Sequence, residues 1–366
     1  MSDLERLVRP DLRGRTAYGA PQLDVAVALN VNESSYAVPA DVVEDMVSAV
    51  RAVAPSLNRY PDREFTKLRT ALAEYLSRSG TPVSPGQVWA GNGSNEVLLH
   101  VLQAFGGPDR VALGFTPAYS MHPVITATTG TRWVDGHRHA WDAAAPFDVT
   151  VAEAVAQVRD VAPNVVFLCS PNNPTGTALS LDLVTAVYDA APDAVVVVDE
   201  AYAEFARAGT PSALTVLGGH PRLVVTRTMS KAFALAGGRL GYLAADASLI
   251  DILRLVRMPY HLSAPTQAIA LAALRHTDEM LATVDVIREQ RDRLVMELRG
   301  LGLVPVPSDA NFVLVGGLDD AHRTWQALLG HGILVRDVGI PHHLRVTAGT
   351  PEETTAFLGA LKEVLA

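Results

Sequence analysis

The stretch that decides the fold reads Leu223-Val-Val-Thr-Arg-Thr-Met-Ser-Lys231-Ala-Phe-Ala-Leu-Ala-Gly-Gly-Arg239-Leu-Gly. Its opening residues are apolar and β-branched, which predicts a buried strand, and the polar residues that follow mark the end of that strand. A lysine held near an apolar wall loses hydration of its ammonium form, so its pKa falls and its neutral amine can attack a carbonyl. Lysine is also common in solvated loops, so this stretch alone leaves a surface role for Lys231 open.

Other short apolar runs alternate with helical patterns in the middle of the chain. The runs cover residues 88–90, 110–114, 165–169, 195–199 and 223–226. Runs that are apolar on both faces and joined by helices predict an α/β fold with a mostly parallel sheet covered on both sides. Such sheets bind ligands beyond the carboxyl ends of their strands, and the polar residues of this chain gather there.

The flanking regions follow a different pattern. Residues 1 to about 30 hold turn residues with little periodicity and predict an arm that wraps another surface. A helix is expected from about 41 to 53, and Asp62 is placed to cap the next one. A long helical stretch from about Pro265 to Leu298 precedes a small α+β unit. We therefore expect an arm and part of the small domain at 1–40, a large domain at 41–262 and a small domain at 263–366.

Composition limits the class of protein. The 366 residues suffice for two units of unequal size, and 49% are hydrophobic, as in a globular enzyme. The formal net charge of -9, with no block of like charge, argues against nucleic acid and membrane as partners. Cys169 is the only cysteine, and neither a signal peptide nor a membrane-spanning run is visible. These features predict a soluble cytoplasmic protein.

Three further polar motifs follow apolar runs. Gly91-Asn-Gly-Ser-Asn-Glu96 precedes a helix, where free N–H groups attract phosphate, although such a loop is equally typical of a plain turn. Ser170-Pro-Asn-Asn-Pro-Thr-Gly176 is stiff enough to present an asparagine amide, or forms an Asx-turn that serves only the loop. Asp199-Glu-Ala-Tyr202 places an acid where a cationic partner is needed, or caps the next helix.

One cofactor explains these motifs together. Pyridoxal 5′-phosphate needs a phosphate cradle, an acid for its ring nitrogen, donors for its phenolate oxygen and a lysine for its aldehyde. All four occur here on successive strand ends. The sequence therefore predicts a pyridoxal-phosphate site and, in the absence of further spaced ligands, no metal site.

The chain resembles the class I/II aminotransferases of fold type I over nearly its whole length, from Tyr18 to the final helix. The motifs that carry this resemblance are Arg59-Tyr-Pro-Asp62, 170–176, Val198-Asp-Glu-Ala-Tyr202, 228–239 and Arg345-Val-Thr-Ala-Gly-Thr350. Stretches at 102–107, 120–123 and 257–263 look like the actinobacterial histidinol-phosphate aminotransferase branch. The resemblance implies a mostly parallel seven-stranded sheet sandwiched by helices, with a smaller α+β domain.

The resemblance also implies residue roles. Lys231 is expected to bond the cofactor aldehyde and then to move a proton, while Asp199 holds the ring nitrogen and Tyr202 and Asn173 hold the phenolate oxygen. Further cofactor contacts are expected from Gly93, Ser94, Asn95, Tyr119, Thr228, Ser230 and Arg239, and from Tyr60 of the other subunit in a homodimer with shared sites.

Substrate residues are implied as well, for a ping-pong transfer between L-histidinol phosphate and 2-oxoglutarate. Arg336 and Arg345 suit bidentate capture of a carboxylate or phosphate, and Asn173 is expected nearby. Tyr36 aligns with a substrate-side tyrosine, but its loop reads Asn32-Glu-Ser-Ser-Tyr-Ala37 where the family has Asn-Glu-Asn-Pro-Tyr-Gly. The missing proline and glycine put the role of Tyr36 in doubt.

Other functions stay open from the sequence. An aromatic amino-acid aminotransferase or a phosphothreonine decarboxylase uses the same cofactor. A transcription regulator with an aminotransferase domain would carry a basic helix-turn-helix unit, which the first 100 residues lack. A plain nucleotide-binding module would leave Lys231 and Asp199 unexplained.

Overall fold

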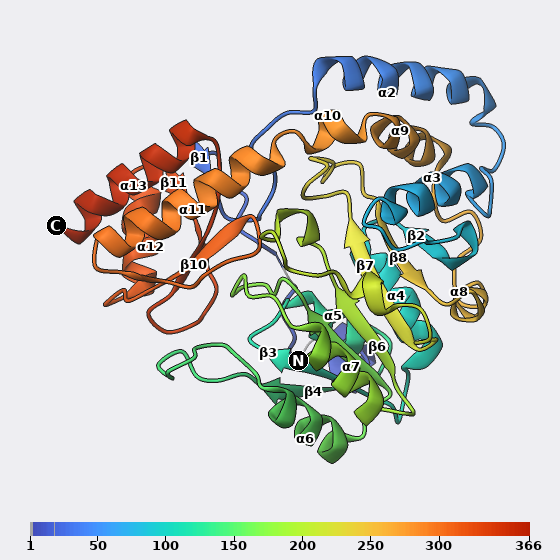
Figure 1. Ribbon diagram of the computed structural model, residues 1–366, viewed down its shortest axis with the longest axis horizontal. Helices are drawn as coiled ribbons and strands as arrows, with labels where there is room; N and C mark the ends of the chain where they lie inside the picture. The colour runs from blue at the N-terminus through green and yellow to red at the C-terminus, as the bar shows by residue number, and fades with distance from the viewer. Residues whose placement is uncertain (1–2, 18) are drawn as a thin grey trace.

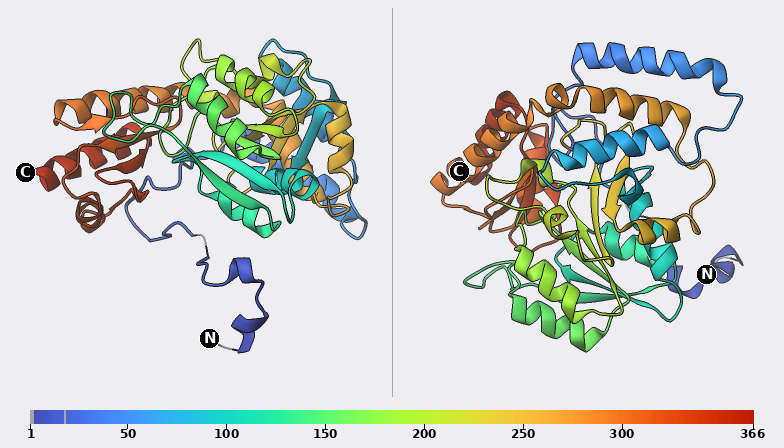
Figure 2. Two further views of the ribbon diagram at one scale, coloured as in Figure 1. Left: turned by 90° about the horizontal axis from the view of Figure 1, so that it is seen from below. Right: turned by 45° about the vertical axis from the view of Figure 1, so that its right-hand side comes forward.

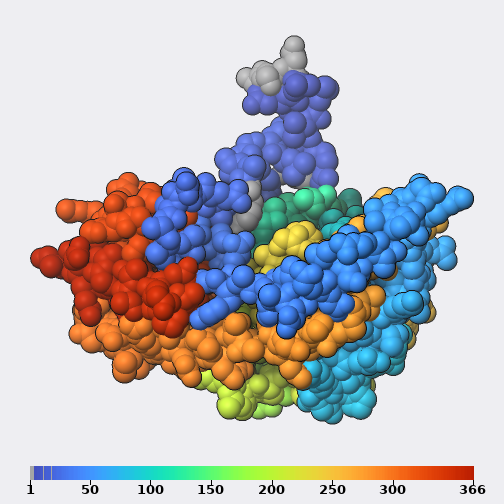
Figure 3. Space-filling view, turned by 90° about the horizontal axis from the view of Figure 1, so that it is seen from above, coloured from blue at the N-terminus to red at the C-terminus, as the bar shows by residue number. Residues whose placement is uncertain are grey.

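The computed structural model describes residues 3–17 and 19–366, so Met1, Ser2 and Tyr18 of the expected arm lie outside the described residues. The described part of the arm holds α1 (Asp3–Leu7) and a 3-10 turn (Pro10–Leu12). It projects from the body of the molecule (Figures 2 and 3). The remaining chain forms a large lobe around one sheet and a smaller lobe at the C-terminal end (Figure 1).

The large lobe is built on a seven-stranded sheet. Its strands are β2 (Val88–Gly91), β3 (Val111–Thr116), β4 (Arg132–His137), β5 (Val165–Cys169), β6 (Val195–Asp199), β7 (Leu223–Thr228) and β8 (Gly241–Ala245). They lie in the order β2-β8-β7-β6-β5-β3-β4, and β8 alone runs antiparallel to its neighbours. Every residue of β5, β6 and β7 is buried, as their apolar runs predict.

Helices cover both faces of this sheet. The helix α4 (Ser94–Phe105) packs on α5 (Met121–Thr128), and α6 (Val151–Val161) packs on α7 (Leu181–Ala190). Figure 2 shows the α6–α7 pair on the opposite side of the sheet from α5. The mostly parallel α/β sandwich expected from the sequence is therefore confirmed.

Five more helices surround the edge near β2. They are α2 (Ala40–Val53), α3 (Thr66–Ser77), α8 (Ala247–Leu253), α9 (Ala264–Arg275) and α10 (Thr277–Leu281). The N-cap position of α3 is taken by Phe65 and not by Asp62, but the Asp62 carboxylate accepts from the N–H of Thr66, the first residue of the helix, at 2.7 Å. The single helical stretch expected to reach Leu298 is wrong, because the helix breaks after Arg275 and again after Leu281. At the first break, the Thr277 hydroxyl donates to the Leu274 carbonyl, a local bond that competes with the helical pattern.

The small lobe has its own sheet and core. The antiparallel strands β9 (Val304–Pro305), β10 (Phe312–Gly316), β12 (Arg336–Asp337) and β13 (Leu344–Thr347) lie in the order β12-β13-β10-β9. They pack with α11 (Val284–Gly300), α12 (Ala321–Gly330) and α13 (Pro351–Leu365).

Residues 333–337 of the small lobe form two short strands. β11 (Ile333–Leu334) pairs in parallel with β1 (Val27–Ala28), whereas β12 pairs with β13. This pairing places the segment that follows the arm beside the small lobe. The domain boundaries near residues 40 and 262 stay predictions. Within residues 3–17 and 19–366, no helix combines the length and the apolar character that crossing a membrane requires.

Candidate active site

Two adjoining cavities lie at the carboxyl ends of the central strands. One of about 380 Å³ is lined by Asp199, Lys231 and Arg239, and we call it the Asp199 cavity. The other, of about 270 Å³, is lined by Lys231, Arg336 and Arg345, and we call it the Arg345 cavity. Residues common to both are Ala20, Val31, Tyr119, Tyr202 and Lys231. Lys231 therefore stands where the two cavities meet.

The amine of Lys231 loses its proton more readily than that of an ordinary lysine. Its Nζ donates to the Val31 carbonyl at 3.0 Å. Burial, reinforced by the positive charge of Arg345, lowers the pKa of Lys231 to about 8. The surface role that the sequence left open for Lys231 is inconsistent with this position.

Asp199 ends β6 and is held on both carboxylate oxygens. The Thr226 hydroxyl donates to Oδ1 at 3.1 Å, and His122 Nε2 lies 3.0 Å from Oδ2. His122 sits in the first turn of α5 and stacks on Phe167 at 4.7 Å between ring centroids. His122 was not predicted as a site residue. Its position three residues after Tyr119 is the one sequence feature that could have indicated it. The carboxylate is thus fixed at the floor of the Asp199 cavity.

Tyr202 is oriented by two amides. Asn32 Nδ2 donates to its hydroxyl oxygen at 3.0 Å, and Asn173 Nδ2 donates at 3.2 Å. Because both bonds use oxygen lone pairs, the hydroxyl hydrogen remains available as a donor. Burial raises the pKa of Tyr202 to about 12, so the hydrogen stays bound at neutral pH. Asn32 was not predicted as a site residue, and its contact spans 170 positions in sequence.

The other end of the Asp199 cavity is rich in hydrogen-bond donors. Ser94 and Asn95 open α4, whose first N–H groups have no intrahelical partner. Gly93 precedes them with φ +84°, and a Cβ there would collide with the Arg239 guanidinium. The remaining polar side chains of this end are Thr228, whose hydroxyl donates to Ser230 at 3.0 Å, and Arg239. Positive charge, helix start and hydroxyls together suit a phosphate.

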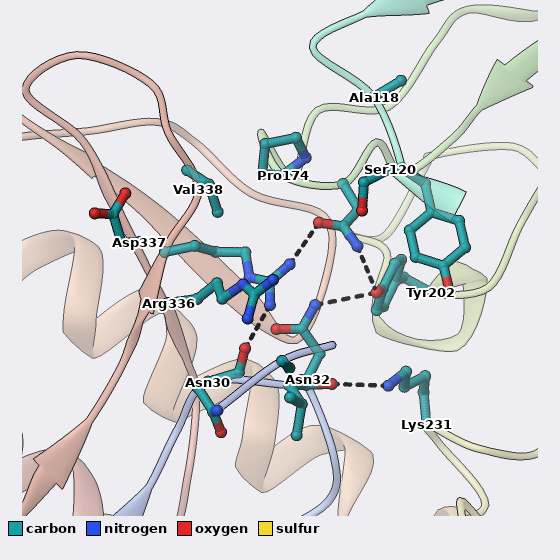
Figure 4. Close-up of a pocket in the computed structure, with 15 residues that line it drawn as sticks. Asn30, Asn32, Ala118, Ser120, Pro174, Tyr202, Lys231, Arg336, Asp337 and Val338 are labelled. Atoms are coloured by element: carbon teal, nitrogen blue, oxygen red, sulfur yellow. Dashed lines mark hydrogen bonds between the residues drawn. The ribbon is translucent and has the colours of Figure 1, made fainter. Parts of the chain in front are cut away.

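The Arg345 cavity contains both predicted arginines. Arg345 donates from Nη1 to Asn173 Oδ1 and from Nη2 to the Asn30 carbonyl, each at 2.6 Å. Arg336 lies opposite Arg345 in the pairing of β12 with β13. Figure 4 shows Arg336 on the far side of this cavity from Lys231. An anion bound between Arg336 and Arg345 would contact both guanidinium groups.

Two predicted residues lie elsewhere. Within the described part of the chain, Tyr36 lines neither cavity and packs instead against the apolar core of the small lobe. Burial and the carboxylates of Glu352 and Glu353 raise its pKa. Tyr60 is 80% exposed, stacks on Tyr260 at 4.4 Å and also lines neither of these cavities. The remaining predicted positions are brought together, and their roles stay predictions.

The residues that line the Asp199 cavity fit pyridoxal phosphate. Asp199 matches a protonated ring nitrogen, the Tyr202 hydroxyl a phenolate oxygen, and the helix start with Arg239 a phosphate. A side chain at Gly93 would be strained by the positive φ of +84° and would displace the Arg239 guanidinium from this end of the cavity. No group of three or more metal-ligating side chains occurs among the residues that the structure describes.

Comparison with known proteins agrees with this geometry. The family model described as aminotransferase class I and II matches residues 25–361. The chain is 60% identical to the histidinol-phosphate aminotransferase of Paenarthrobacter aurescens (strain TC1), over 100% of this chain and 98% of that protein. It is 56% identical to the histidinol-phosphate aminotransferase of Thermobifida fusca (strain YX), over 97% and 94% respectively.

A solved structure is also similar. The crystal structure of histidinol-phosphate aminotransferase from Sinorhizobium meliloti in complex with pyridoxal-5′-phosphate matches with a TM-score of 0.81 and 26% identity. The match covers 93% of this chain and 91% of that one. The sequence, the fold and the cavity thus agree, and the chain belongs to the class I and II aminotransferases.

Proposed function

We propose that this chain is a pyridoxal-phosphate-dependent aminotransferase that acts on L-histidinol phosphate. The nitrogen passes to 2-oxoglutarate, which gives imidazole acetol phosphate and L-glutamate in histidine biosynthesis. One observation carries the proposal. Lys231 stands between the Asp199 cavity, which fits the cofactor, and a second cavity with two arginines, which fits an anionic substrate.

The chain's own residues divide the work. Bound pyridoxal phosphate supplies the electron sink for the charge that develops at the substrate Cα. Lys231, with its pKa near 8, offers a neutral amine that takes the proton from the substrate Cα. The amine then holds this proton at Nζ for transfer to the cofactor. Asp199, fixed by His122 and Thr226, keeps a proton on the ring nitrogen. Tyr202 donates its remaining hydrogen to the phenolate oxygen.

The cofactor's other groups are held at the donor-rich end. Tyr119 lines both cavities and is the aromatic ring available to stack on the cofactor. The phosphate is assigned to Gly93, Ser94, Asn95, Thr228, Ser230 and Arg239.

The two arginines explain how one site takes two substrates. The phosphate of histidinol phosphate and a carboxylate of glutamate are both anions that a planar guanidinium binds through paired hydrogen bonds. Arg345 is held in place by Asn173 and Asn30, so it is presented without further ordering. Arg336 is the second contact. A role for Tyr36 is not supported by its position outside both cavities.

A homodimer completes the site in this proposal. Among the described residues, Tyr60 lines neither the Asp199 cavity nor the Arg345 cavity of its own chain, as expected if it contacts the phosphate of the partner subunit. Leu255 and Met258 are exposed near its stacking partner Tyr260, and such an apolar surface suits burial between subunits. We also assign the chain to the cytoplasm, where its one cysteine, buried Cys169, stays reduced.

A panel of amino donors with 2-oxoglutarate tests the function. Histidinol phosphate is expected to give the highest kcat/KM among histidinol phosphate, phenylalanine, tyrosine and phosphothreonine. A preference for phenylalanine, or release of carbon dioxide from phosphothreonine, would instead identify one of the two other reactions that use this cofactor.

A further inference from the structure

A third apolar cluster joins the two lobes beside the Arg345 cavity. Phe147, Val306 and Leu314 are buried together, and Val338 and Ile340 pack against them. Phe147 comes from the loop between β4 and α6, whereas the other four come from the small lobe. In Figure 1 that green loop extends toward the orange and red strands. The cluster is therefore a contact between parts of the chain that are far apart in sequence.

The backbone of the loop is held in an unusual conformation to deliver Phe147. Phe147 has φ +61°, a left-handed value that is uncommon for a residue with a side chain. Buried Arg138 donates from Nη1 to the Phe147 carbonyl at 3.2 Å and from Nε to the Phe115 carbonyl at 3.0 Å. The guanidinium thus ties the loop to the end of β3. Strain of this kind persists only where surrounding contacts enforce it.

A second contact joins the same two segments. The Trp141 ring lies 5.0 Å from the His342 ring and 5.9 Å from the His343 ring, measured between centroids. The Phe147 ring lies 5.4 Å from the His343 ring. Four rings therefore bridge the loop and the segment that returns to β13.

Val338 connects this cluster to the substrate side. Val338 packs against the cluster and also lines the Arg345 cavity, together with Arg336 and Asp337. Figure 4 shows these three residues together at one side of the cavity. Arg336 and Asp337 form β12, which lies at the edge of its sheet with β13 as its only strand neighbour, and Val338 follows directly after this two-residue strand. Such a short edge strand needs packing from outside the sheet to stay in place.

We propose that Phe147 is a positioning residue for substrate recognition, which holds Val338 and, through it, Arg336 at the anion-binding end of the cavity. The inference rests on the proposed function. Arg336 is two residues from Val338, so a cluster that loosens lets the guanidinium move relative to Lys231. A misplacement of about 1 Å can cost roughly 100-fold in an enzyme reaction. The effect belongs to substrate binding and leaves the Asp199 cavity intact.

Steady-state kinetics of the holoenzyme separate positioning from general stability. Phe147→Ala is expected to raise KM for histidinol phosphate by about tenfold or more, with kcat within about threefold and an unchanged cofactor absorption spectrum. Val306→Ala is the matched control, because Val306 is buried in the same cluster but does not line the cavity. It is expected to lower the melting temperature and leave KM within about twofold. Phe147→Leu should restore most of the lost affinity.

A binding measurement tests the role of Phe147 without turnover of the substrate. The affinity of the holoenzyme for inorganic phosphate, measured by calorimetry, should fall about tenfold in Phe147→Ala and stay unchanged in Val306→Ala. Val338→Ala removes the connecting side chain and replaces Phe147→Ala if that variant does not fold.

Three outcomes are decisive. Wild-type KM and phosphate affinity in Phe147→Ala, or in Val338→Ala, overturn the inference. Equal losses in Phe147→Ala and Val306→Ala also overturn it, because they indicate a general loss of packing. Absence of histidinol-phosphate turnover in the wild type counts against the proposed function, and phosphate affinity then decides the inference by itself.

Discussion

His122 Nε2 lies 3.0 Å from Asp199 Oδ2, and both side chains are buried. This contact joins α5 on one face of the sheet to the end of β6 in its centre. Among the described residues, the only other side chain that donates a hydrogen bond to Asp199 is that of Thr226, through its hydroxyl. The orientation of the acid that we propose for the cofactor nitrogen therefore depends on a histidine from another element.

Replacing His122 is expected to slow the reaction without preventing folding. His122→Phe keeps the ring stacked on Phe167 and removes the bond to a charged group, worth about 1.5–3 kcal/mol. We expect kcat to fall roughly 10- to 100-fold. The control is His100→Phe, which removes a bond to Trp89 Nε1 outside both cavities and should lower stability but not kcat. Equal kcat values for the two variants would contradict the role of His122.

The lowered pKa of Lys231 predicts a pH dependence of stability in the cofactor-free protein. The ordinary lysine pKa is 10.5 and the folded value is about 8. Between these values the unfolded chain binds one more proton than the folded chain, so the free energy of unfolding rises with pH. Relative to Lys231→Met, the wild type should gain up to about 3 kcal/mol between pH 8 and pH 10.5. Denaturant titrations at both pH values measure it, and a constant difference would contradict a lowered pKa.

Tyr202→Phe is expected to reduce both stability and cofactor affinity. The change leaves the amides of Asn32 and Asn173 without their shared acceptor in a buried site, at a cost of about 1–3 kcal/mol. It also removes the hydroxyl that we propose as a donor to the cofactor. Tyr75→Phe removes a part-buried bond to Glu204, and because neither residue lines the Asp199 cavity or the Arg345 cavity it should affect stability alone. Cofactor dissociation constants for the two variants make the comparison, and equal constants would rule out a cofactor contact from Tyr202.

Arg345→Lys tests the need for a forked side chain. Arg345 donates to Asn173 and to the Asn30 carbonyl at the same time, and a lysine ammonium cannot reproduce this planar geometry. We expect kcat/KM for both substrates to fall roughly 10- to 100-fold. Arg222→Lys changes a similar fork, which bonds the carbonyls of Ala191 and Ala194 outside both cavities. A loss of activity in Arg222→Lys as large as in Arg345→Lys would show that the effect is not local.

Much of the site was predictable because strand ends carry it. Asp199 and Lys231 follow long apolar runs, and parallel strands must bring their carboxyl ends to one edge of the sheet. The sequence could not supply the partners of these residues. His122 comes from a helix, and Asn32 reaches Tyr202 across 170 positions. Contacts of that kind depend on how whole elements pack, which residue patterns do not encode locally.

The wrong expectation about the long helix has a local cause. The long helix predicted to Leu298 breaks at His276, where a threonine hydroxyl offers a competing bond. The parallel pairing of β1 with β11 could not be predicted, because β1 is a two-residue strand with no visible periodicity. Phe147 gave no signal at all, because a single aromatic residue in a loop looks like any other until its neighbours are known.

The most direct test is the half-reaction of purified holoenzyme with histidinol phosphate in the absence of 2-oxoglutarate. We expect the visible absorption of the lysine-bound cofactor to be lost within one turnover. Phenylalanine at the same concentration should act much more slowly, and Lys231→Ala should lack the absorption from the start. Retention of the absorption with histidinol phosphate, together with its rapid loss with phenylalanine, would contradict the proposed function.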